Sequence, residues 1–267
     1  LLMCELFVMS SSHPVTVTYS MREFARHGGL TANHADGWGI AYLEDRNARV
    51  FRDTDAAAES PYFQLVSALG VRSDTVVSHI RRATQGKVAL RNTQPFAREL
   101  GGRVHLFAHN GDLHGIDRLP ELQLGRNLPI GETDSEHAFC ALLHHLSHLW
   151  TKSDEVAELS ERLRIVVDFA SEIRRLGPAN LIYTDGDAIF LHGHRRTHDD
   201  GVVRPPGLHL LCRSCEVTPG PIEIPGLAIT SQTQNVVLAA SVPLTGEGWT
   251  PLAEGEVVAA HKGEVIR

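Results

Sequence analysis

The order of the predicted elements is the feature that most limits what this chain can fold into. Apolar runs predict strands before and after a pair of helices, and no repeated period links strand to helix. The early strands lie at 4–9, 37–43, 48–51, 75–79 and 104–108, and the late ones at 181–184, 188–191, 207–212, 236–240 and 256–261. This order predicts a layered α+β domain and argues against a doubly wound βαβ sheet.

The helical pair lies in the middle of the chain. Thr133-Asp134-Ser135-Glu136 is a capping sequence, and it predicts a helix that runs to about Trp150. A second helix is predicted from about Ser153 to Leu176, ended by Gly177-Pro178. Shorter helices are predicted at 18–27 and 61–69. No Pro/Ser-rich linker divides the chain, so we expect residues 4–267 to form a single domain.

Composition excludes several classes of function. With 42% hydrophobic and 21% charged residues the chain can bury a core, and its formal net charge of −7 argues against nucleic-acid binding. No apolar run reaches the ~18 residues of a membrane span. Four cysteines and no secretory signal favour a reducing compartment, so we expect a cytoplasmic protein. Cys212-Arg-Ser-Cys215 could hold a metal or a redox pair, but strand-end cysteines explain it better and we expect no metal.

The Met3-Cys4 step predicts an unusual nucleophile. Methionine before a small residue is a substrate for N-terminal trimming, so we expect residues 1–3 to be absent from the working protein. Cys4 would then carry a thiol and a free α-amine, and an amine that titrates near ~8 can accept the thiol proton. The alternative, a lipidated cysteine, lacks the required apolar segment and a small residue before the cysteine.

Three further polar clusters interrupt the apolar background, at 79–86, 109–112 and 131–136. An Arg at a strand end can bind a carboxylate with two hydrogen bonds. An Asn side chain next to a Gly N–H supplies two donors to one oxygen, which describes an oxyanion hole. A helix-start Asp can accept from an ammonium group. Taken one at a time, these clusters are more often a hairpin turn, a surface charge and an ordinary helix cap. Together with Cys4 they describe a site for the side-chain amide of an amino acid.

In this combination the chain resembles the class II glutamine amidotransferases of the N-terminal nucleophile hydrolase superfamily, and within them the stand-alone YafJ-like type. The resemblance covers nearly the whole chain and rests on the following segments: Met3-Cys-Glu-Leu6, Asp36-Gly-Trp-Gly39, Arg81 with its neighbours, Asn92-Thr-Gln-Pro-Phe96, Asn110-Gly111, Gly131-Glu-Thr-Asp134 and Pro243-Leu-Thr-Gly246. It implies a four-layer αββα sandwich of two antiparallel sheets between helical layers.

The resemblance also implies roles for individual residues. Cys4 corresponds to the nucleophile, and Asn110 with the Gly111 amide to the oxyanion hole. In the substrate pocket, Arg81 would bind the α-carboxylate of glutamine with Thr84 beside it, and Asp134 would bind the α-amine. Arg26 corresponds more loosely to a residue near the nucleophile. The family requires no cofactor.

The expected activity is hydrolysis of glutamine to glutamate and ammonia. Because no synthase motif accompanies the site in these 267 residues, the ammonia would need an accepting partner enzyme. Gln85 and Gln94 replace histidines common in relatives, and Arg82 replaces an aromatic residue found in some. These departures keep two alternatives open: hydrolysis of a larger γ-glutamyl amide, and amino-acid sensing without catalysis.

Overall fold

Two antiparallel sheets form the centre of the molecule. The computed structural model describes residues 4–17, 21, 23–25, 36–152, 155–216, 222–224, 227–229 and 233–267. The seven-stranded sheet has the order β15 (Thr250–Pro251), β11 (His209–Glu216), β14 (Thr233–Ala240), β1 (Glu5–Val15), β4 (Ser73–Ile80), β2 (Trp38–Glu44) and β3 (Asn47–Asp53). The six-stranded sheet has the order β17 (Glu264–Ile266), β16 (Val257–His261), β8 (Ile189–His192), β7 (Ala179–Thr184), β6 (Arg103–Gly111) and β5 (Phe96–Leu100).

Smaller elements connect these sheets. Two short ribbons pair β9 (Arg196–Thr197) with β10 (Val203–Arg204), and β12 (Ile222–Ile224) with β13 (Leu227–Ile229). Single 3₁₀ turns lie at Leu90–Asn92, Ile116–Arg118 and Pro120–Leu122. The α-helices described in full are α2 (Pro61–Ala68), α3 (Asp134–Leu146) and α4 (Leu159–Ile173). Among the described residues, none of the helices combines the length and apolar character needed to cross a bilayer.

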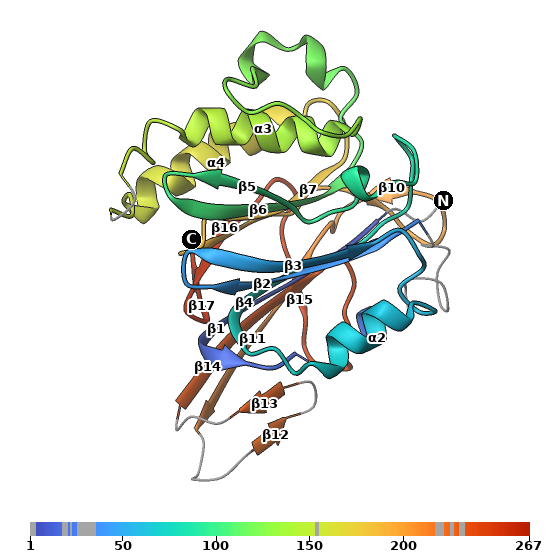
Figure 1. Ribbon diagram of the computed structural model, residues 1–267, viewed down its shortest axis with the longest axis vertical. Coiled ribbons are helices and arrows are strands. Elements are labelled where there is room, and N and C mark those ends of the chain that lie inside the picture. Colours follow the sequence, from blue (N-terminus) through green and yellow to red (C-terminus); the bar gives the residue numbers. More distant parts are fainter. Residues whose placement is uncertain are drawn as a thin grey trace.

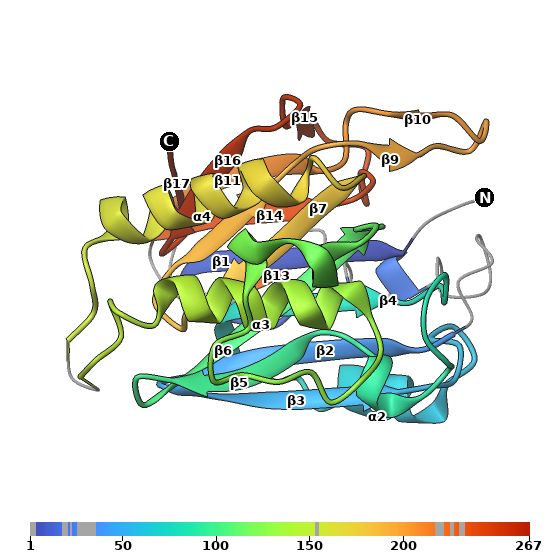
Figure 2. The ribbon, with the colours of Figure 1, turned by 90° about the horizontal axis from the view of Figure 1, so that it is seen from above.

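The sheets stack face to face, with helices outside them. Figure 1 shows α3 and α4 covering the outer face of the six-stranded sheet, and α2 lying below the seven-stranded sheet. Seen from above, α3 and α4 lie side by side across the strands beneath them (Figure 2). The predicted α+β sandwich with helical outer layers is therefore confirmed.

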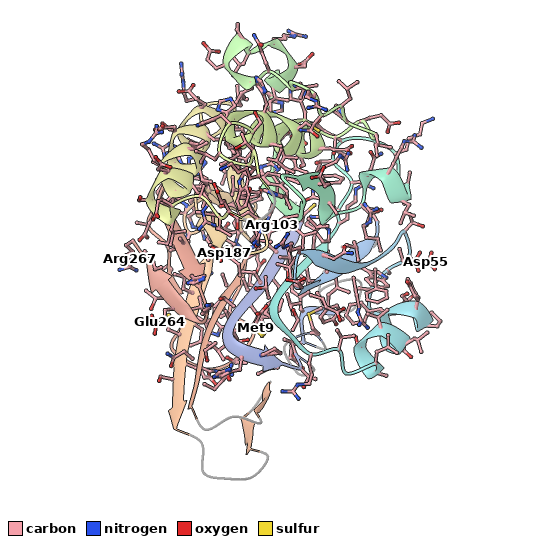
Figure 3. The ribbon with its side chains drawn as sticks, turned by 60° about the vertical axis from the view of Figure 1, so that its left-hand side comes forward. Met9, Asp55, Arg103, Asp187, Glu264 and Arg267 are labelled. Carbon is pink, nitrogen blue, oxygen red and sulfur yellow. The ribbon has the colours of Figure 1, made fainter. Side chains whose placement is uncertain are left out.

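Three apolar cores follow from the alternation of side chains along the strands. In β1, Leu6 and Val8 face the space between the sheets, whereas Phe7 and Met9 face the α2 layer. A third core lies between the six-stranded sheet and the α3–α4 layer, where Phe107 packs on Phe139. Met9 lies inside the molecule in Figure 3, while Asp55, Glu264 and Arg267 reach its outer edges. Central strands such as β7 and β8 are buried on both faces and largely apolar, whereas the edge strands β3 and β5 are more polar and partly exposed.

Helices α2 and α3 start where the sequence predicts, whereas the end of α3 and the start of α4 differ from the prediction. Thr133 Oγ1 accepts a hydrogen bond from the Glu136 N–H at 3.2 Å, as the capping sequence predicts. However, α3 ends at Leu146 instead of Trp150, and α4 begins at Leu159 instead of Ser153. Of the helix predicted at 18–27, the described residues Met21 and Phe24 are buried and helical.

Candidate active site

Cys4 lies immediately before β1, at one end of the space between the two sheets. Its neighbour Glu5 pairs with Ile80 at the end of β4, which places Arg81 and Arg82 beside it. Cys4 Sγ accepts a hydrogen bond from the Arg82 N–H at 3.1 Å and donates to the Arg82 carbonyl at 3.2 Å. The thiol is therefore held against the backbone of the strand end, while Cys4 as a whole residue is partly exposed.

Asn110 reaches the same point from the other sheet. It lies near the end of β6 and is almost fully buried. Its Nδ2 donates to the Cys4 carbonyl oxygen and lies 3.5 Å from Ser241 Oγ. Its Oδ1 is buried without a hydrogen-bond partner in the described part of the chain. The two residues are 106 positions apart in the sequence, so only the stacking of the sheets brings them together.

Gly111 follows Asn110 where no larger residue fits. A Cβ atom at this position would lie 1.9 Å from the Pro178 carbonyl oxygen and 2.7 Å from His109 Nε2. The absence of a side chain therefore allows β6 to approach the segment before β7 closely. Gly111 is partly exposed, and its N–H follows the Asn110 amide along the chain, as an oxyanion hole requires.

Arg81 is buried with one side of its guanidinium unused. Its Nη2 donates to the carbonyl oxygens of Gln85 at 3.0 Å and Gly86 at 3.3 Å, whereas Nη1 has no hydrogen-bond partner among the described residues. Burial lowers the pKa of Arg81, although the charges of Cys4, Asp36 and Glu132 act to raise it. Because an unpaired buried donor is costly, this N–H is suited to an anionic ligand.

Asp134 is the first residue of α3 and is fixed by backbone donors. Its Oδ2 accepts from the Leu113 N–H at 2.7 Å, and its Oδ1 accepts from the Ser135 N–H at 2.7 Å. The carboxylate borders a cavity of about 320 Å³ that is lined by Gln85, Leu113, His114, Gly115, Ile116, Asp117, Pro129, Gly131, Glu132, Thr133, Asp134 and His137. The carboxylate can therefore meet a ligand without moving.

The structure says less about the roles of Thr84 and Arg26, and it gives partners to the two glutamines that depart from the family pattern. Thr84 lies in the segment between Arg81 and Gly86, and its side chain is exposed. Arg26 lies outside the described residues. Gln85 Nε2 donates to Asp112 Oδ1 at 2.5 Å, and Gln94 Oε1 accepts from the His109 N–H at 2.6 Å. Both glutamines therefore have structural partners on the segment that carries Asn110.

The surroundings of Cys4 decide its reactivity. Burial raises the pKa of the Cys4 thiol to about 11, although the Arg82 N–H and the Arg81 charge act in the opposite direction. Only the thiolate is a strong nucleophile. A thiol with this pKa needs an adjacent base to react at neutral pH, and the freed α-amine of a processed Cys4 would be that base.

Two buried asparagines of the site region received no role from the sequence: Asn180 was not noted, and Asn92 was noted only as the start of a matching segment. Asn180 in β7 donates from Nδ2 to the Asn110 carbonyl at 3.0 Å. Asn92 donates from Nδ2 to the Lys87 carbonyl at 2.9 Å and to Glu132 Oε2 at 2.8 Å, which links the Arg81 segment to the cavity wall. Asn180 interrupts the apolar run of its strand. A buried amide in an apolar strand needs partners, and this signal could have identified it.

Comparison with known proteins places this geometry in a family. The model of the family described as class-II glutamine amidotransferases matches residues 3–267. YafJ of Escherichia coli, a proposed glutamine amidotransferase, is 36% identical over 255 residues, which cover 95% of this chain and 96% of YafJ. The crystal structure of a predicted glutamine amidotransferase from Pseudomonas aeruginosa matches with a TM-score of 0.69 and 34% identity, covering 99% of this chain and 100% of that one.

A more distant structure supports the fold alone. The glutamine phosphoribosylpyrophosphate amidotransferase of Bacillus subtilis matches with a TM-score of 0.59 at 15% identity, covering 98% of this chain and 48% of that one. The family model extends over the site segments and both sheets, and the relatives from Escherichia coli and Pseudomonas aeruginosa match along nearly their whole length. The chain therefore belongs to the class II glutamine amidotransferases.

Proposed function

We propose that this protein hydrolyses the side-chain amide of glutamine through a thioester on Cys4. The observation that carries the proposal is the hydrogen bond from Asn110 Nδ2 to the Cys4 carbonyl oxygen, which joins a cysteine and an amide donor from different sheets. Arg81, with an unused buried N–H, and Asp134, with a preorganised carboxylate, supply the groups that an α-carboxylate and an α-amine need.

The proposed reaction begins at the Cys4 sulfur. The α-amine of processed Cys4 accepts the thiol proton, and Sγ forms a bond to the amide carbon of glutamine. The resulting oxyanion accepts hydrogen bonds from Gly111 N–H and from the second N–H of Asn110 Nδ2, because the first serves the Cys4 carbonyl. The α-ammonium group of Cys4 returns the proton to the amide nitrogen of the substrate, the C–N bond breaks, and ammonia leaves. Water then attacks the thioester with the same amine as base, which releases glutamate and the thiol.

This mechanism requires removal of residues 1–3. In the chain that retains them, the Cys4 nitrogen is an amide and cannot act as the base, and the thiol has a pKa of about 11. We infer that the working protein is a single domain that begins at Cys4, and that the ammonia passes to a partner enzyme.

The test compares processed protein with a Cys4→Ala variant. Processed wild-type protein should release glutamate and ammonia from glutamine, and its mass should lack residues 1–3. Cys4→Ala should remain folded and inactive. Equal activity of the two proteins, or full activity in protein that retains residues 1–3, would remove Cys4 from the reaction.

One second candidate remains, a larger γ-glutamyl amide. It is favoured by Gln85, which replaces a histidine common in relatives and lines the cavity beside Asp134, so that this part of the pocket is modified. Comparison of kcat/KM distinguishes the two candidates. If kcat/KM is tenfold higher for γ-glutamyl conjugates than for glutamine, a difference of about 1.4 kcal/mol in transition-state binding, the conjugates replace glutamine as the proposed substrate.

A further inference from the structure

A fully buried asparagine lies directly behind the Asn110–Gly111 peptide. Asn180 belongs to β7, and both of its amide hydrogens are used: Nδ2 donates to the Asn110 carbonyl at 3.0 Å and to the Arg195 carbonyl at 2.7 Å. Its Oδ1 accepts from the His194 N–H at 2.8 Å. An asparagine has two donor hydrogens and one acceptor oxygen, so this side chain is held in a single orientation.

Packing holds the same side chain in place. A Cβ atom at Gly207 would lie 1.6 Å from Asn180 Oδ1, so the glycine makes room for the amide and packs against it. A leucine or valine could fill this part of the core as well as asparagine does, but could make none of the three hydrogen bonds. The asparagine at this position is therefore explained by its hydrogen bonds to the surrounding backbone atoms, and not by packing alone.

One of those backbone atoms belongs to the oxyanion site. The Asn110 carbonyl and the Gly111 N–H are opposite ends of one planar trans peptide, so fixing the direction of the first fixes the second. Asn110 lies opposite Asn180 in the ladder, and the Asp112 N–H donates to the Pro178 carbonyl at 3.0 Å. Because bonded and non-bonded pairs alternate along an antiparallel ladder, Gly111 occupies a non-bonded position and its N–H points away from β7.

The strand on the other side ends before it reaches Gly111. The first residue of β5, Phe96, lies opposite Phe107, so β6 continues past the ladder there. The His109 N–H on this edge is bonded by Gln94 Oε1 at 2.6 Å. The next N–H directed to the same edge is that of Gly111, beyond the reach of the β5 ladder.

We propose that Asn180 is a positioning residue for the oxyanion hole. In the ladder the Asn110 carbonyl already faces the Asn180 backbone N–H, and Asn180 Nδ2 adds a second donor that fixes the direction of this carbonyl. The second bond thereby directs the Gly111 N–H toward the carbonyl of the substrate and strengthens that N–H as a donor. This inference rests on the proposed function, because an oxyanion forms only if the Cys4 thiol attacks a substrate amide. Asn180 itself does not touch the substrate.

The experiment compares Asn180→Ala and Asn180→Asp with Asn92→Ala. Asn92 is a matched control because it too is fully buried, donates twice from Nδ2 and accepts at Oδ1 from the Glu132 N–H at 2.9 Å. In the Asn180 variants the Gly111 N–H should be misdirected, which should lower kcat by about 10–100-fold and leave KM within about threefold of wild type. Asn92→Ala should instead raise KM, because Asn92 orders the cavity wall.

A second measurement separates positioning from general damage. Alkylation of Cys4 by iodoacetamide proceeds without an oxyanion, so its rate should stay near the wild-type rate in the Asn180 variants while hydrolysis falls. If kcat falls only as far as in Asn92→Ala, or if alkylation slows in parallel with hydrolysis, Asn180 has a structural role only. Absence of hydrolysis in processed wild-type protein would instead overturn the proposed function, and the variants would then be compared by alkylation alone.

Discussion

At the scale of single residues, the site depends on how burial changes chemistry. Cys4 and Arg81 lie side by side, and desolvation acts against the charged form of both. Burial therefore keeps the thiol protonated, while it leaves a guanidinium N–H that only a ligand can satisfy. In this buried environment the Cys4 thiol is unreactive by itself. It therefore depends on a local base and on a bound substrate.

The pH dependence of Cys4 alkylation should reveal that base. In protein that retains residues 1–3, the iodoacetamide reaction rate should rise toward pH 11, following the thiol. In processed protein the rate should rise instead around the α-amine pKa of ~8. Rates measured by mass spectrometry from pH 6 to 11 on both forms test this. Identical profiles would contradict the role of the amine.

Arg81 and Asn110 should affect different kinetic constants. Arg81→Ala removes a contact to the substrate that persists throughout the reaction, so it should raise KM more than it lowers kcat. Asn110→Ala removes an oxyanion donor and should lower kcat by roughly 10²–10³-fold. Steady-state kinetics on processed protein measure both. A fall in kcat with unchanged KM for Arg81→Ala would assign Arg81 to the transition state.

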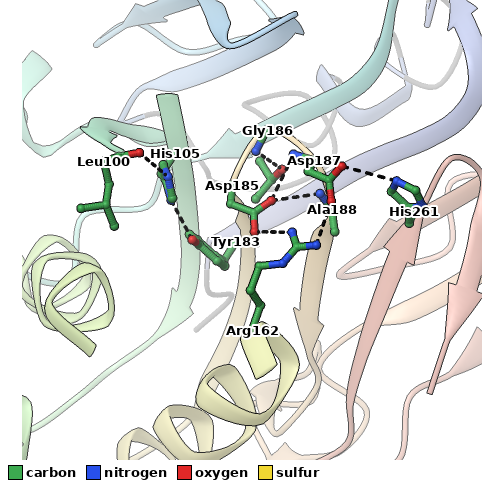
Figure 4. A network of polar contacts seen from close by, with 10 residues as sticks. Leu100, His105, Arg162, Tyr183, Asp185, Gly186, Asp187, Ala188 and His261 are labelled. Carbon is green, nitrogen blue, oxygen red and sulfur yellow. Dashed lines mark hydrogen bonds and ion pairs between the residues drawn. The ribbon is translucent and has the colours of Figure 1, made fainter. Parts of the chain in front are cut away.

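At the scale of elements, α4 is fixed to the six-stranded sheet by a buried ion network. Arg162 Nη1 lies 2.7 Å from Asp185 Oδ2 and its Nη2 lies 2.8 Å from Asp187 Oδ2 (Figure 4). The Asp185 side chain is fully buried and also accepts from the Ala188 N–H at 3.0 Å. The network therefore joins the helix to the turn that follows β7, and β7 is the strand that carries Asn180.

Removing Arg162 should be costly. Arg162→Ala leaves Asp185 buried without its charged partner, which typically costs about 3–5 kcal/mol of the free energy of unfolding. Arg164 on the same helix pairs with Asp168 at 3.4 Å, with both side chains about two-thirds exposed, and Arg164→Ala should cost at most about 0.5 kcal/mol. Urea unfolding of the two variants measures the difference. Similar costs would mean that the buried pair adds little.

At the scale of the whole molecule, stability should depend on buried neutral histidines. Burial lowers the pKa values of His105 and His192 to about 4. His105 is held by Tyr183 Oη at 2.7 Å and the Leu100 carbonyl at 3.0 Å (Figure 4). In the unfolded chain both would titrate near 6.5, so between pH 6.5 and 4 the unfolded state binds more protons.

The sign of that difference gives the prediction. Stability should be complete above pH 6.5 and fall as the pH drops toward 4, at about 1.4 kcal/mol per histidine for each pH unit. Thermal unfolding at pH 7, 6 and 5 should show the loss before most carboxylates titrate. His105→Gln should reduce the slope. A melting temperature that does not change between pH 7 and 5 would contradict neutral burial of these histidines.

Much of this protein could be predicted from its sequence because the signals are local. Alternating and continuous apolar runs indicate strands, a capping sequence fixes the start of α3, and their order predicts a layered α+β domain, while the resemblance to a family implied the two sheets with helical outer layers. The chemistry of Cys4, Arg81, Asn110 and Asp134 could be named for the same reason, because each group lies at one end of a strand or starts a helix. The end of α3 and the start of α4 were less predictable because tertiary packing decides how far a helix extends.

Only the tertiary structure decided how these groups meet. The contacts of Asn110 with Cys4, Gln85 with Asp112 and Asn180 with the Asn110 carbonyl join residues 27 to 106 positions apart. The pairing register of the strands and the stacking of the two sheets determine such contacts, and neither is written in any single segment. Asn180 was missed for this reason: within its own strand it is one polar residue, and its partners appear only when β7 lies between β6 and the 194–195 segment.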